Sequence, residues 1–426
     1  MTKGKIDVVL GLQRGDEGKG RLSDKLAATH DIVARYNGGP NAGHTIVVRG
    51  QKISLHQVPS GALYPKVINV IGHGMYVDPI KLLDEIAGLQ AKGIKLAPKN
   101  LAVSYAAHLI LPHHILLDEQ REGGKLAQGS TKAGIAYVAR DKYERSGVRA
   151  ELLLNDAHSL EQKIIEGLQL AKVKPDPTKI NKWLAKASRL KPFITDTAKL
   201  LNEQLEKGKS VLAEGAQAAW LDIDGGMYPY VTSSHPTIGG ALNGLRVSHH
   251  FVDRVYGVMK AVPSHVGDGP FVTEITDDKL ADKIRGRRGE VDAEFGATTG
   301  RPRRVGWLDL PAIRTAIRDN GVTDVVMTKL DTLQKYSDLG SIPIAVAYKY
   351  QGKTLAAAPS SAYMLADCQP VYREVKLWQG NVTKVTTWRD LPDGAKKFVE
   401  FIEEQLGAPI SLVGVGPGRE QLLSRS

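Results

Sequence analysis

The sequence has little of several features that mark special classes of protein. It contains one cysteine, Cys368, so no disulfide can form within the chain, and we expect a reducing compartment. No apolar run approaches 18 residues, and no signal-type segment precedes the first strand pattern, so we expect a soluble, cytoplasmic protein. Aromatic residues make up only 6% of the chain, which leaves few platforms for stacking nucleic-acid bases.

Basic residues outnumber acidic ones, but they are dispersed along the chain. Lys and Arg together number 57 against 46 Asp and Glu, a formal net charge of +11. This balance suits a polyanionic partner, either nucleic acid or phosphorylated small molecules. The longest basic cluster is only "KIRGRRGE" at 283–290. Small anionic ligands are therefore favoured over nucleic acid.

Apolar, β-branched runs alternate with segments of helical spacing over most of the chain. The 426 residues are 42% hydrophobic, enough for one large core. Predicted strands are "IDVVL", "HDIVARY", "KVINVIG", "LAVSY", "SVLAEGA", "RVYGVMKAV" and "VTDVVMTKL", with helical spacing at 156–171 and 179–206. The pattern predicts an α/β fold in which a large, mostly parallel central sheet is flanked by helices and ligands bind at the carboxyl ends of strands. We expect one domain, 1–426, with an inserted helical subdomain at about 151–207.

The loop "GLQRGDEGKG" at 11–20 follows the first strand and looks like a phosphate-binding loop with the wrong spacing. A P-loop needs a glycine where Gln13 stands and a hydroxyl where Gly20 stands. It also carries two carboxylates, Asp16 and Glu17, which repel an anion. The alternative is an ordinary strand-to-helix turn in which Asp16 caps the helix.

Two further loops gather polar groups. "NGGPNAGHT" at 37–45 surrounds His44 with glycines and amides that leave it little apolar surface, which favours a role toward substrate over a structural one. "FGATTGRPRRVGW" at 295–307 places two hydroxyls and three arginines between Phe295 and Trp307. Arginines on an anchored loop suit bidentate capture of carboxylate or phosphate, although a charge run is usually a solvated face.

The tetrapeptide "TKLD" at 328–331 closes a predicted strand. Guanine presents two adjacent hydrogen-bond donors, N1–H and the 2-amino group, and one aspartate can accept hydrogen bonds from both. A lysine stem can lie over the ring. The motif is common, so it indicates guanine recognition only in combination with a phosphate loop in the same chain.

Together these stretches resemble the adenylosuccinate synthetase family along nearly the whole chain. The matching segments also include "HQVPSGAL", "EGAQAAWLDIDGGMYPYVTSS", "VGDGPFVTEI" and "GPGRE". The resemblance implies GTP-dependent joining of L-aspartate to IMP, with Mg²⁺, to give adenylosuccinate, GDP and phosphate. It also implies a homodimer in which Arg145 reaches IMP in the neighbouring subunit.

The resemblance assigns a role to each matching residue. Asp16 is implied as the base that takes the N1 proton of IMP and, with the carbonyl of Gly43, as a Mg²⁺ ligand, whereas Lys19 and His44 act on the transferred phosphoryl group. The implied IMP contacts are Asn41, Thr131, Arg145, Gln217, Thr232, Val266 and Arg301. The implied aspartate contacts are Thr298, Thr299 and Arg301, and the implied GTP contacts are Gly18, Lys19, Gly20, Thr45, Arg303, Lys329, Asp331, Gly414 and Gly416.

The chain departs from the family pattern in several places and leaves two rival hypotheses open. The family usually has Trp at Arg14, Arg at His265, often Ser at Gly414, and an arginine in place of part of "GSTKAGIAY" at 129–137. The last change bears on the nucleotide, since a viral relative uses dGMP instead of IMP. Against that branch stand Asp16, which its members commonly replace, and the intact "TTGRPRR" loop. The other rival is a GTP-controlled switch or nucleic-acid-binding protein, disfavoured by the missing Walker spacing.

Overall fold

A ten-stranded sheet runs through the middle of the chain's fold in the computed structural model, which describes residues 3–48, 51–124, 130–290, 293–296 and 300–425. Its strands, in spatial order, are β19 (Leu422–Ser424), β18 (Ile410–Gly414), β14 (Asp324–Thr328), β11 (Val252–Lys260), β1 (Lys5–Gly11), β10 (Ser210–Glu214), β2 (Ile32–Arg35), β5 (Ile68–Ile71), β7 (Leu101–Ser104) and β9 (Ile194–Thr195). All neighbours pair in parallel except β18 and β19. The predicted mostly parallel sheet is confirmed.

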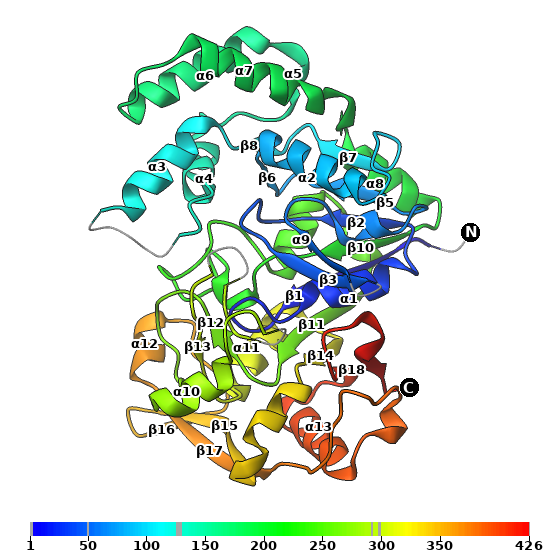
Figure 1. The fold of residues 1–426 in the computed structure, drawn as a ribbon, viewed down its shortest axis with the longest axis vertical. Coiled ribbons are helices and arrows are strands. Elements are labelled where there is room, and N and C mark those ends of the chain that lie inside the picture. The colour runs from blue at the N-terminus through cyan, green and yellow to red at the C-terminus, as the bar shows by residue number, and fades with distance from the viewer. Residues whose placement is uncertain (1–2, 49–50, 125–129, 291–292, 297–299, 426) are drawn as a thin grey trace.

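Helices and small sheets surround this central sheet (Figure 1). The helices are α1 (Lys19–Ala27), α2 (Pro79–Ala91), α3 (Pro112–Glu122), α4 (Ile135–Glu144), α5 (Glu151–Asn155), α6 (Ala157–Leu170), α7 (Pro177–Ala187), α8 (Thr197–Glu206), α9 (Ile238–Leu245), α10 (Asp278–Arg285), α11 (Leu310–Asn320), α12 (Ala362–Asp367) and α13 (Asp393–Leu406). The small sheets pair β3 (His44–Val48) with β4 (Gln51–Leu55), β6 (Tyr76–Val77) with β8 (His108–Leu109), β12 (Ser264–His265) with β13 (Arg304–Val305), and β15 (Ser341–Tyr350) with β16 (Lys353–Leu355) and β17 (Gln369–Lys376).

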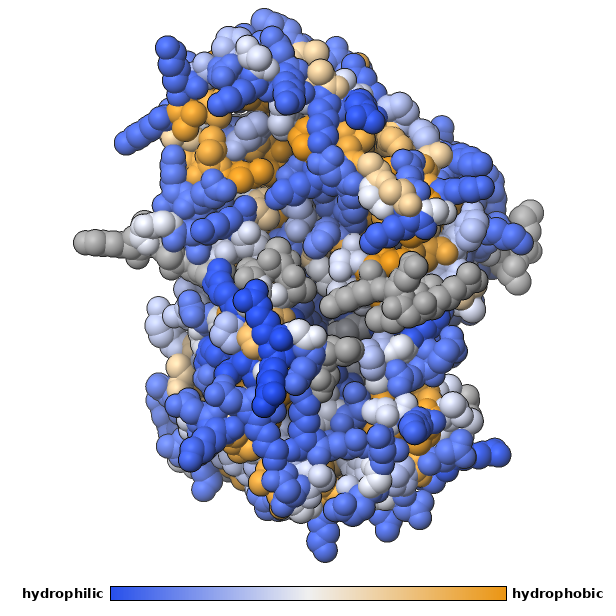
Figure 2. All heavy atoms as spheres, viewed as in Figure 1, coloured by the Kyte–Doolittle hydropathy of each residue, from blue (hydrophilic) through white to orange (hydrophobic). Residues whose placement is uncertain are grey.

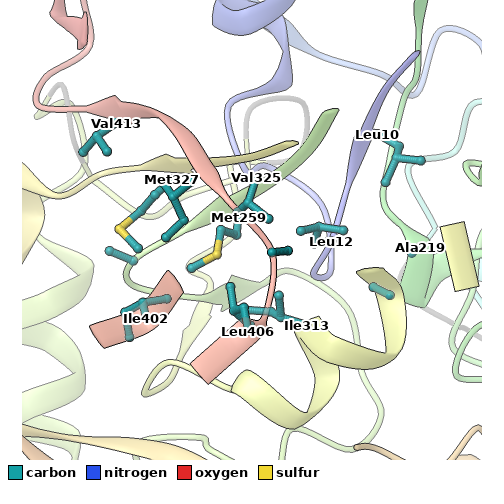
Figure 3. Close-up of a cluster of buried hydrophobic side chains, with 14 of the residues drawn as sticks. Leu10, Leu12, Ala219, Met259, Ile313, Val325, Met327, Ile402, Leu406 and Val413 are labelled. Atoms are coloured by element: carbon teal, nitrogen blue, oxygen red, sulfur yellow. The ribbon is translucent and has the colours of Figure 1, made fainter. Parts of the chain in front are cut away.

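Both faces of the central sheet are buried. Successive residues of a strand point to opposite faces, so neighbours in one strand belong to different clusters. Leu10 of β1 belongs to a cluster with Ile313 of α11 and Ile402 of α13 on one face (Figure 3). Val9 belongs to a separate cluster with Leu22 of α1 on the other face. A nearly continuous apolar strand sequence is therefore what this position in the fold requires.

The region predicted as a helical subdomain is more varied than its sequence spacing suggests. Asp176 caps α7 by accepting from the backbone N–H groups of Thr178 and Lys179, which explains the interruption at "KPDP". The helical spacing predicted over 179–206 is wrong at its centre, where a 3-10 helix with Pro192 leads into β9, an edge strand of the main sheet. The domain boundary at about 151–207 stays a prediction.

The helices α5 to α7 form a layer at one end of the molecule (Figure 1). Their apolar residues, such as Leu160 and Ile164, pack in one cluster with Leu82 and Ile86 of α2. Figure 2 shows apolar side chains gathered in this upper part of the molecule, whereas hydrophilic side chains dominate the rest of the visible face. No helix in the described part of the chain is both long and apolar enough to cross a membrane.

Candidate active site

The loops that follow neighbouring strands of the central sheet converge on one cavity of about 510 Å³. It is lined by the loop after β1, the loop before β3, and segments around 130–136, 217–233 and 265–268. Crevices at the carboxyl ends of parallel strands are the usual ligand sites of open α/β sheets. The predicted location of the site is therefore the location of this cavity.

Most residues predicted to act on IMP, metal or phosphate line this cavity. They are Asp16, Gly18, Lys19, Gly20, Asn41, Gly43, His44, Thr45, Thr131, Gln217, Thr232, Val266 and Arg303. Arg145 stands apart from this lining, as an exposed residue at the end of α4. Thr298 and Thr299 lie outside the described residues. The roles of all these residues stay predictions.

Helix α1 begins at Lys19 because Gly18 adopts a left-handed conformation (φ 92°) that ends the loop. No side chain caps this helix, so the alternative in which Asp16 is its N-cap is wrong. The helix also passes very close to β3: a Cβ on Gly20 would lie 2.8 Å from Cβ of His44. Glycine at this position thus brings the positive end of α1 beside the histidine.

The two carboxylates of the loop are counter-ions for cations of the site. Oδ2 of Asp16 lies 2.7 Å from Nη2 of Arg303. Oε2 of Glu17 lies 2.6 Å from Nζ of Lys19, and both side chains are buried. Glu17 also fixes the loop, because its Oε1 accepts from the backbone N–H of Gly15 and its carbonyl oxygen accepts from the hydroxyl of Thr328. The acidic residues that seemed wrong for a phosphate loop therefore balance the positive charge of Lys19 in the loop and of Arg303 across the site.

His44 is held by a carboxylate that the sequence reasoning missed. Glu214, fully buried at the end of β10, accepts a hydrogen bond from Nδ1 of His44 and two from the backbone and hydroxyl of Ser60. Burial alone would raise the pKa of Glu214, but His44 and Arg35 outweigh it and lower the pKa to about 2. Burial lowers the pKa of His44 itself. The signal in the sequence that could have revealed Glu214 is an acidic residue at the end of a buried strand.

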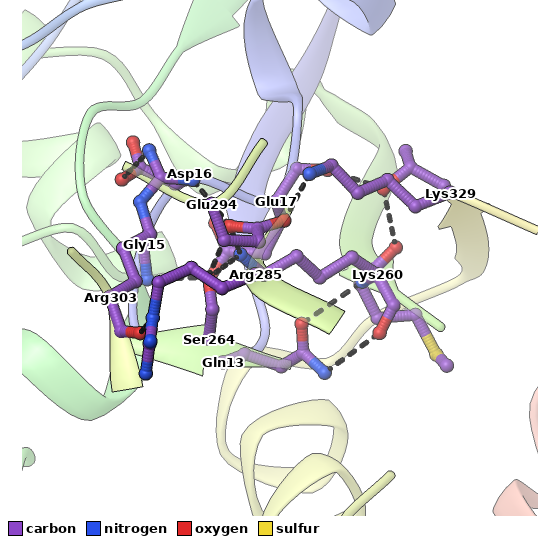
Figure 4. Close-up of polar contacts among 12 residues, drawn as sticks. Gln13, Gly15, Asp16, Glu17, Lys260, Ser264, Arg285, Glu294, Arg303 and Lys329 are labelled. Carbon is purple, nitrogen blue, oxygen red and sulfur yellow. Dashed lines mark hydrogen bonds and ion pairs between the residues drawn. The ribbon is translucent and has the colours of Figure 1, made fainter. Parts of the chain in front are cut away.

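A second buried carboxylate, Glu294, joins three cations behind the cavity (Figure 4). It pairs with Lys260, Arg303 and Lys329. Burial would raise the pKa of Glu294, but these cations hold it well below its usual range. Burial also lowers the pKa of Lys260 to about 8. Neither Glu294 nor Lys260 was predicted as a site residue, although "EFGATTG" places an acid directly before the polar loop.

The residues predicted to read guanine lie together beside the cavity but outside its lining. Lys329 and Asp331 follow β14, and Gly414 and Gly416 lie at the end of the neighbouring β18. The backbone N–H of Leu330 donates to the carbonyl of Gly414 at 3.0 Å, which fixes the two segments side by side. Glu294 connects this group to the cavity through its contacts with Lys329 and Arg303.

Several departures from the family pattern are also located. Arg14 is buried with its guanidinium 4.7 Å from the ring centre of Phe271, beside His265, whose pKa burial lowers to about 4. In the altered loop, Lys132 is exposed and does not line the cavity, whereas Thr131 does. Arg301 donates to the carbonyl of Ser130 at 3.1 Å, linking its own loop to this one. At this side the cavity is lined by the polar residues Ser130 and Thr131 and the apolar residues Ile135 and Ala136.

Two groups of acidic and histidine side chains in the described residues could in principle hold a metal, and neither includes Asp16. One consists of His113, His114 and Asp141. Nδ1 of His114 accepts from the backbone N–H of Leu111, so its proton sits on Nε2 and is donated to Asp141 at 2.9 Å. This imidazole has no lone pair left for a metal. The other group is Asp222, Asp224 and His235.

Comparisons with known proteins agree with the motifs. The family model described as adenylosuccinate synthetase matches residues 8–423. An adenylosuccinate synthetase of Halothermothrix orenii is 43% identical over 431 residues, which cover 98% of each chain. The fully ligated adenylosuccinate synthetase of Plasmodium falciparum is similar in structure, with a TM-score of 0.92 and 36% identity over 99% of this chain and 100% of that one.

The viral branch is more distant. The succinoaminodeoxyadenylate synthetase of cyanophage S-2L, solved with dGMP and dATP, matches 100% of this chain and 96% of its own with a TM-score of 0.59 and 19% identity. This likeness shows a shared fold alone. Because the family model spans nearly the whole sequence and a full-length relative shares 43% of it, the chain belongs to the adenylosuccinate synthetase family.

Proposed function

We propose that the chain joins L-aspartate to IMP with GTP, forming adenylosuccinate, GDP and phosphate. The observation that carries this proposal is the convergence of Asp16, Lys19 and His44 on one cavity with the predicted IMP contacts. Asp16 and Lys19 come from the loop after β1 and the start of α1, and His44 comes from the start of β3, so the fold brings the imidazole to the carboxylate and the cation. GTP use and the ligase class follow from the family.

In the proposed reaction Asp16 accepts the N1 proton of IMP, and O6 then attacks the γ-phosphate of GTP, releasing GDP. The amine of aspartate attacks C6 of the 6-phosphoryl intermediate and displaces phosphate. Asp16 suits the first step because its side chain is 36% exposed and faces the cavity, so a ligand can reach it. Lys19 at the start of α1 offers positive charge to the transferred group.

His44 is proposed to stabilise the negative charge that develops on the phosphoryl group and O6. Glu214 is ionised and accepts a hydrogen bond from Nδ1, which leaves Nε2 as the ring nitrogen for the ligand. The imidazole is buried and its pKa is lowered, so it is neutral in the free protein at neutral pH. The negative charge of an incoming phosphate favours the protonated form, which can donate from Nε2.

Mg²⁺ is proposed as the cofactor, and the residues at the cavity fit it. The Asp16 carboxylate and the Gly43 backbone both line the cavity, and carboxylate and carbonyl oxygens are the ligands that Mg²⁺ prefers. A bound Mg²⁺ would offset the charge of the triphosphate beside Asp16. In the free protein Arg303 pairs with Oδ2 of Asp16, so this contact has to break before that oxygen can bind Mg²⁺.

A homodimer is also proposed. Arg145 is exposed and lies away from the cavity of its own chain, as expected if it acts on IMP held by a partner subunit. Aspartate is proposed to bind at the loop that contains Thr298, Thr299 and Arg301. With a single, buried cysteine, a reducing compartment such as the cytoplasm remains the expected location.

The test is release of phosphate from GTP in the presence of IMP, aspartate or both. A ligase releases phosphate only when both are present, whereas a GTP-controlled switch does so without them. A panel of IMP, dIMP, GMP and dGMP then identifies the nucleotide. We expect IMP to give the highest kcat/KM. Arg301 can hydrogen-bond to a 2′-hydroxyl, which deoxynucleotides lack, and nothing described in the cavity requires the 2-amino group of dGMP. A clear preference for dGMP would move the chain to the viral branch.

A further inference from the structure

Glu294 is the shared counter-ion of three cations that belong to different parts of the site. Its Oε1 accepts from Nζ of Lys329. Its Oε2 lies 2.5 Å from Nη1 of Arg303 and 3.4 Å from Nζ of Lys260 (Figure 4). The hydroxyl of Ser264 donates to the same oxygen at 2.6 Å. The carboxylate is fully buried, so these contacts are not screened by water.

Arg303 links this carboxylate to Asp16. Nη1 of its guanidinium pairs with Glu294, and Nη2 pairs with Asp16 at 2.7 Å. The end at Glu294 is fixed twice, because the backbone N–H of Arg303 also donates to the carbonyl of Glu294 at 2.9 Å. The end at Asp16 is partly exposed and faces the cavity. Only the second contact is placed to exchange with a ligand.

The charges of the cluster are unequal in the free protein. Lys260, Arg303 and Lys329 supply three positive charges, whereas Glu294 and Asp16 supply two negative ones. An arriving anion is therefore attracted to the cluster. A cation that turns toward the ligand also stops repelling the cations that stay beside Glu294, so the cluster holds these more firmly.

We propose that Glu294 is a positioning residue that couples recognition of guanine to release of Asp16 for its role as base. The proposal rests on the function proposed above. When Lys329 turns from Oε1 to the guanine base, it no longer repels Arg303, so Nη1 of Arg303 stays paired with Glu294. Nη2 then leaves Asp16 for the triphosphate while the guanidinium stays anchored, and Asp16 becomes available to IMP.

The test is a double-mutant cycle on Glu294→Gln and Lys329→Met, with kcat and KM for GTP measured at saturating IMP and aspartate. Glu294→Gln should lower kcat roughly 100-fold, the scale of a misplaced catalytic group, because Arg303 loses its anchor. Lys329→Met should raise KM for GTP and lower kcat less than Glu294→Gln does, because Lys329 no longer competes with Arg303 for Glu294 in that variant. The double variant should have the kcat of Glu294→Gln, because Lys329 acts on Asp16 only through Glu294. A loss of kcat in Lys329→Met equal to that in Glu294→Gln, or a Glu294→Gln protein with normal kcat, would overturn the proposal.

Two controls separate coupling from a structural effect. Glu290→Gln removes an exposed carboxylate four residues away that contacts the backbone of Arg287, and it should leave kcat unchanged. Glu294→Gln leaves buried cations without their partner and can fail to fold. The double variant loses one cation with one carboxylate, so its kcat can then be compared with that of Lys329→Met alone. A kcat tenfold or more below that of Lys329→Met supports the proposal, and equal values contradict it.

Failure of the proposed function is distinguished by the wild-type protein. If it gives no turnover with IMP, aspartate and GTP, the ligase assignment fails. The same four proteins are then compared by their dissociation constants for GTP. The two changes must again be non-additive if Glu294 and Lys329 act as one unit, and additive constants would overturn the coupling by themselves.

Discussion

Glu214 accepts a hydrogen bond from Nδ1 of His44 and holds the imidazole in one orientation at the wall of the cavity. The same carboxylate is fixed by Ser60, whose backbone N–H and hydroxyl both donate to it at 2.8 Å. The arrangement selects the tautomer that leaves Nε2 for the ligand. A carboxylate at a strand end and a histidine 170 positions earlier thus act as one unit.

We expect Glu214→Gln to lower kcat by roughly 10- to 100-fold, the usual scale for losing a partner that orients a functional histidine. The change also has a signature in stability. The folded-state pKa of Glu214 is about 2, below the ordinary 4.5, so its stabilising contribution is complete above pH 4.5 and is lost as the pH falls toward 2.

The free energy of unfolding, measured by urea denaturation across this pH range, should therefore fall less steeply in Glu214→Gln than in the wild type. Ser60→Ala, which keeps the charge of Glu214, serves as the control and should retain the steep dependence. Parallel curves for wild type and Glu214→Gln would contradict the assignment.

Asp16→Asn should abolish turnover while GTP still binds, because an amide cannot accept the N1 proton of IMP at neutral pH. A loss of about 10² to 10⁴ in kcat is the usual scale for a positioned base. Arg303 keeps its contact with Glu294 in this variant, so its place in the site should survive. Steady-state rates test the loss of turnover, and a titration with GTP tests the retained binding. Near-normal turnover by a folded variant would contradict the assignment of Asp16 as the base.

Asp331→Asn should shift base preference from GTP toward xanthosine triphosphate. Xanthine has an oxygen where guanine has its amino group, so an amide can donate where the carboxylate accepted. The measurement is the ratio of kcat/KM for the two triphosphates. An unchanged ratio would show that "TKLD" is only the end of a strand.

Arg145→Leu and Asp16→Asn should each be inactive alone but should complement each other when mixed. In a dimer whose sites are shared across the interface, a hybrid has one intact site of two. Random exchange then restores roughly a quarter of the wild-type activity. Subunit exchange is verified with differently tagged chains, and exchange without any recovery would argue against a shared site.

The sequence predicts the sheet well because each buried parallel strand leaves a local signature of β-branched residues. All seven strands named from such runs are present, and the segments after β1, β2, β10 and β11 line the cavity. The segment 179–206 shows the limit of local reading. Its spacing suits a helix, but β9 forms there because Ile194 pairs with Val103 of β7, a partner 91 residues away.

The site is predictable only where a motif carries it. Asp16, Lys19 and His44 stand in glycine-rich loops, and the resemblance supplied their roles. Glu214 and Glu294 were not predicted as site residues, because each is a single acid whose role depends on partners far along the chain. Nothing near Glu294 in the sequence shows that Lys260 and Lys329 converge on it, since the sheet alone brings β11 and β14 together.

The position of β1 at the centre of the sheet has a consequence for synthesis of the chain. Its two neighbours, β10 and β11, begin at Ser210 and Val252, so β1 is made almost 200 residues before either neighbour. Arg303, Glu294 and Lys329 are translated later still. Folding dominated by such distant pairings is slow, and the glycine-rich loop after β1 lacks its hydrogen bond from Thr328 until β14 is made. A nascent chain interrupted before β14 would therefore expose apolar strands without any partial activity.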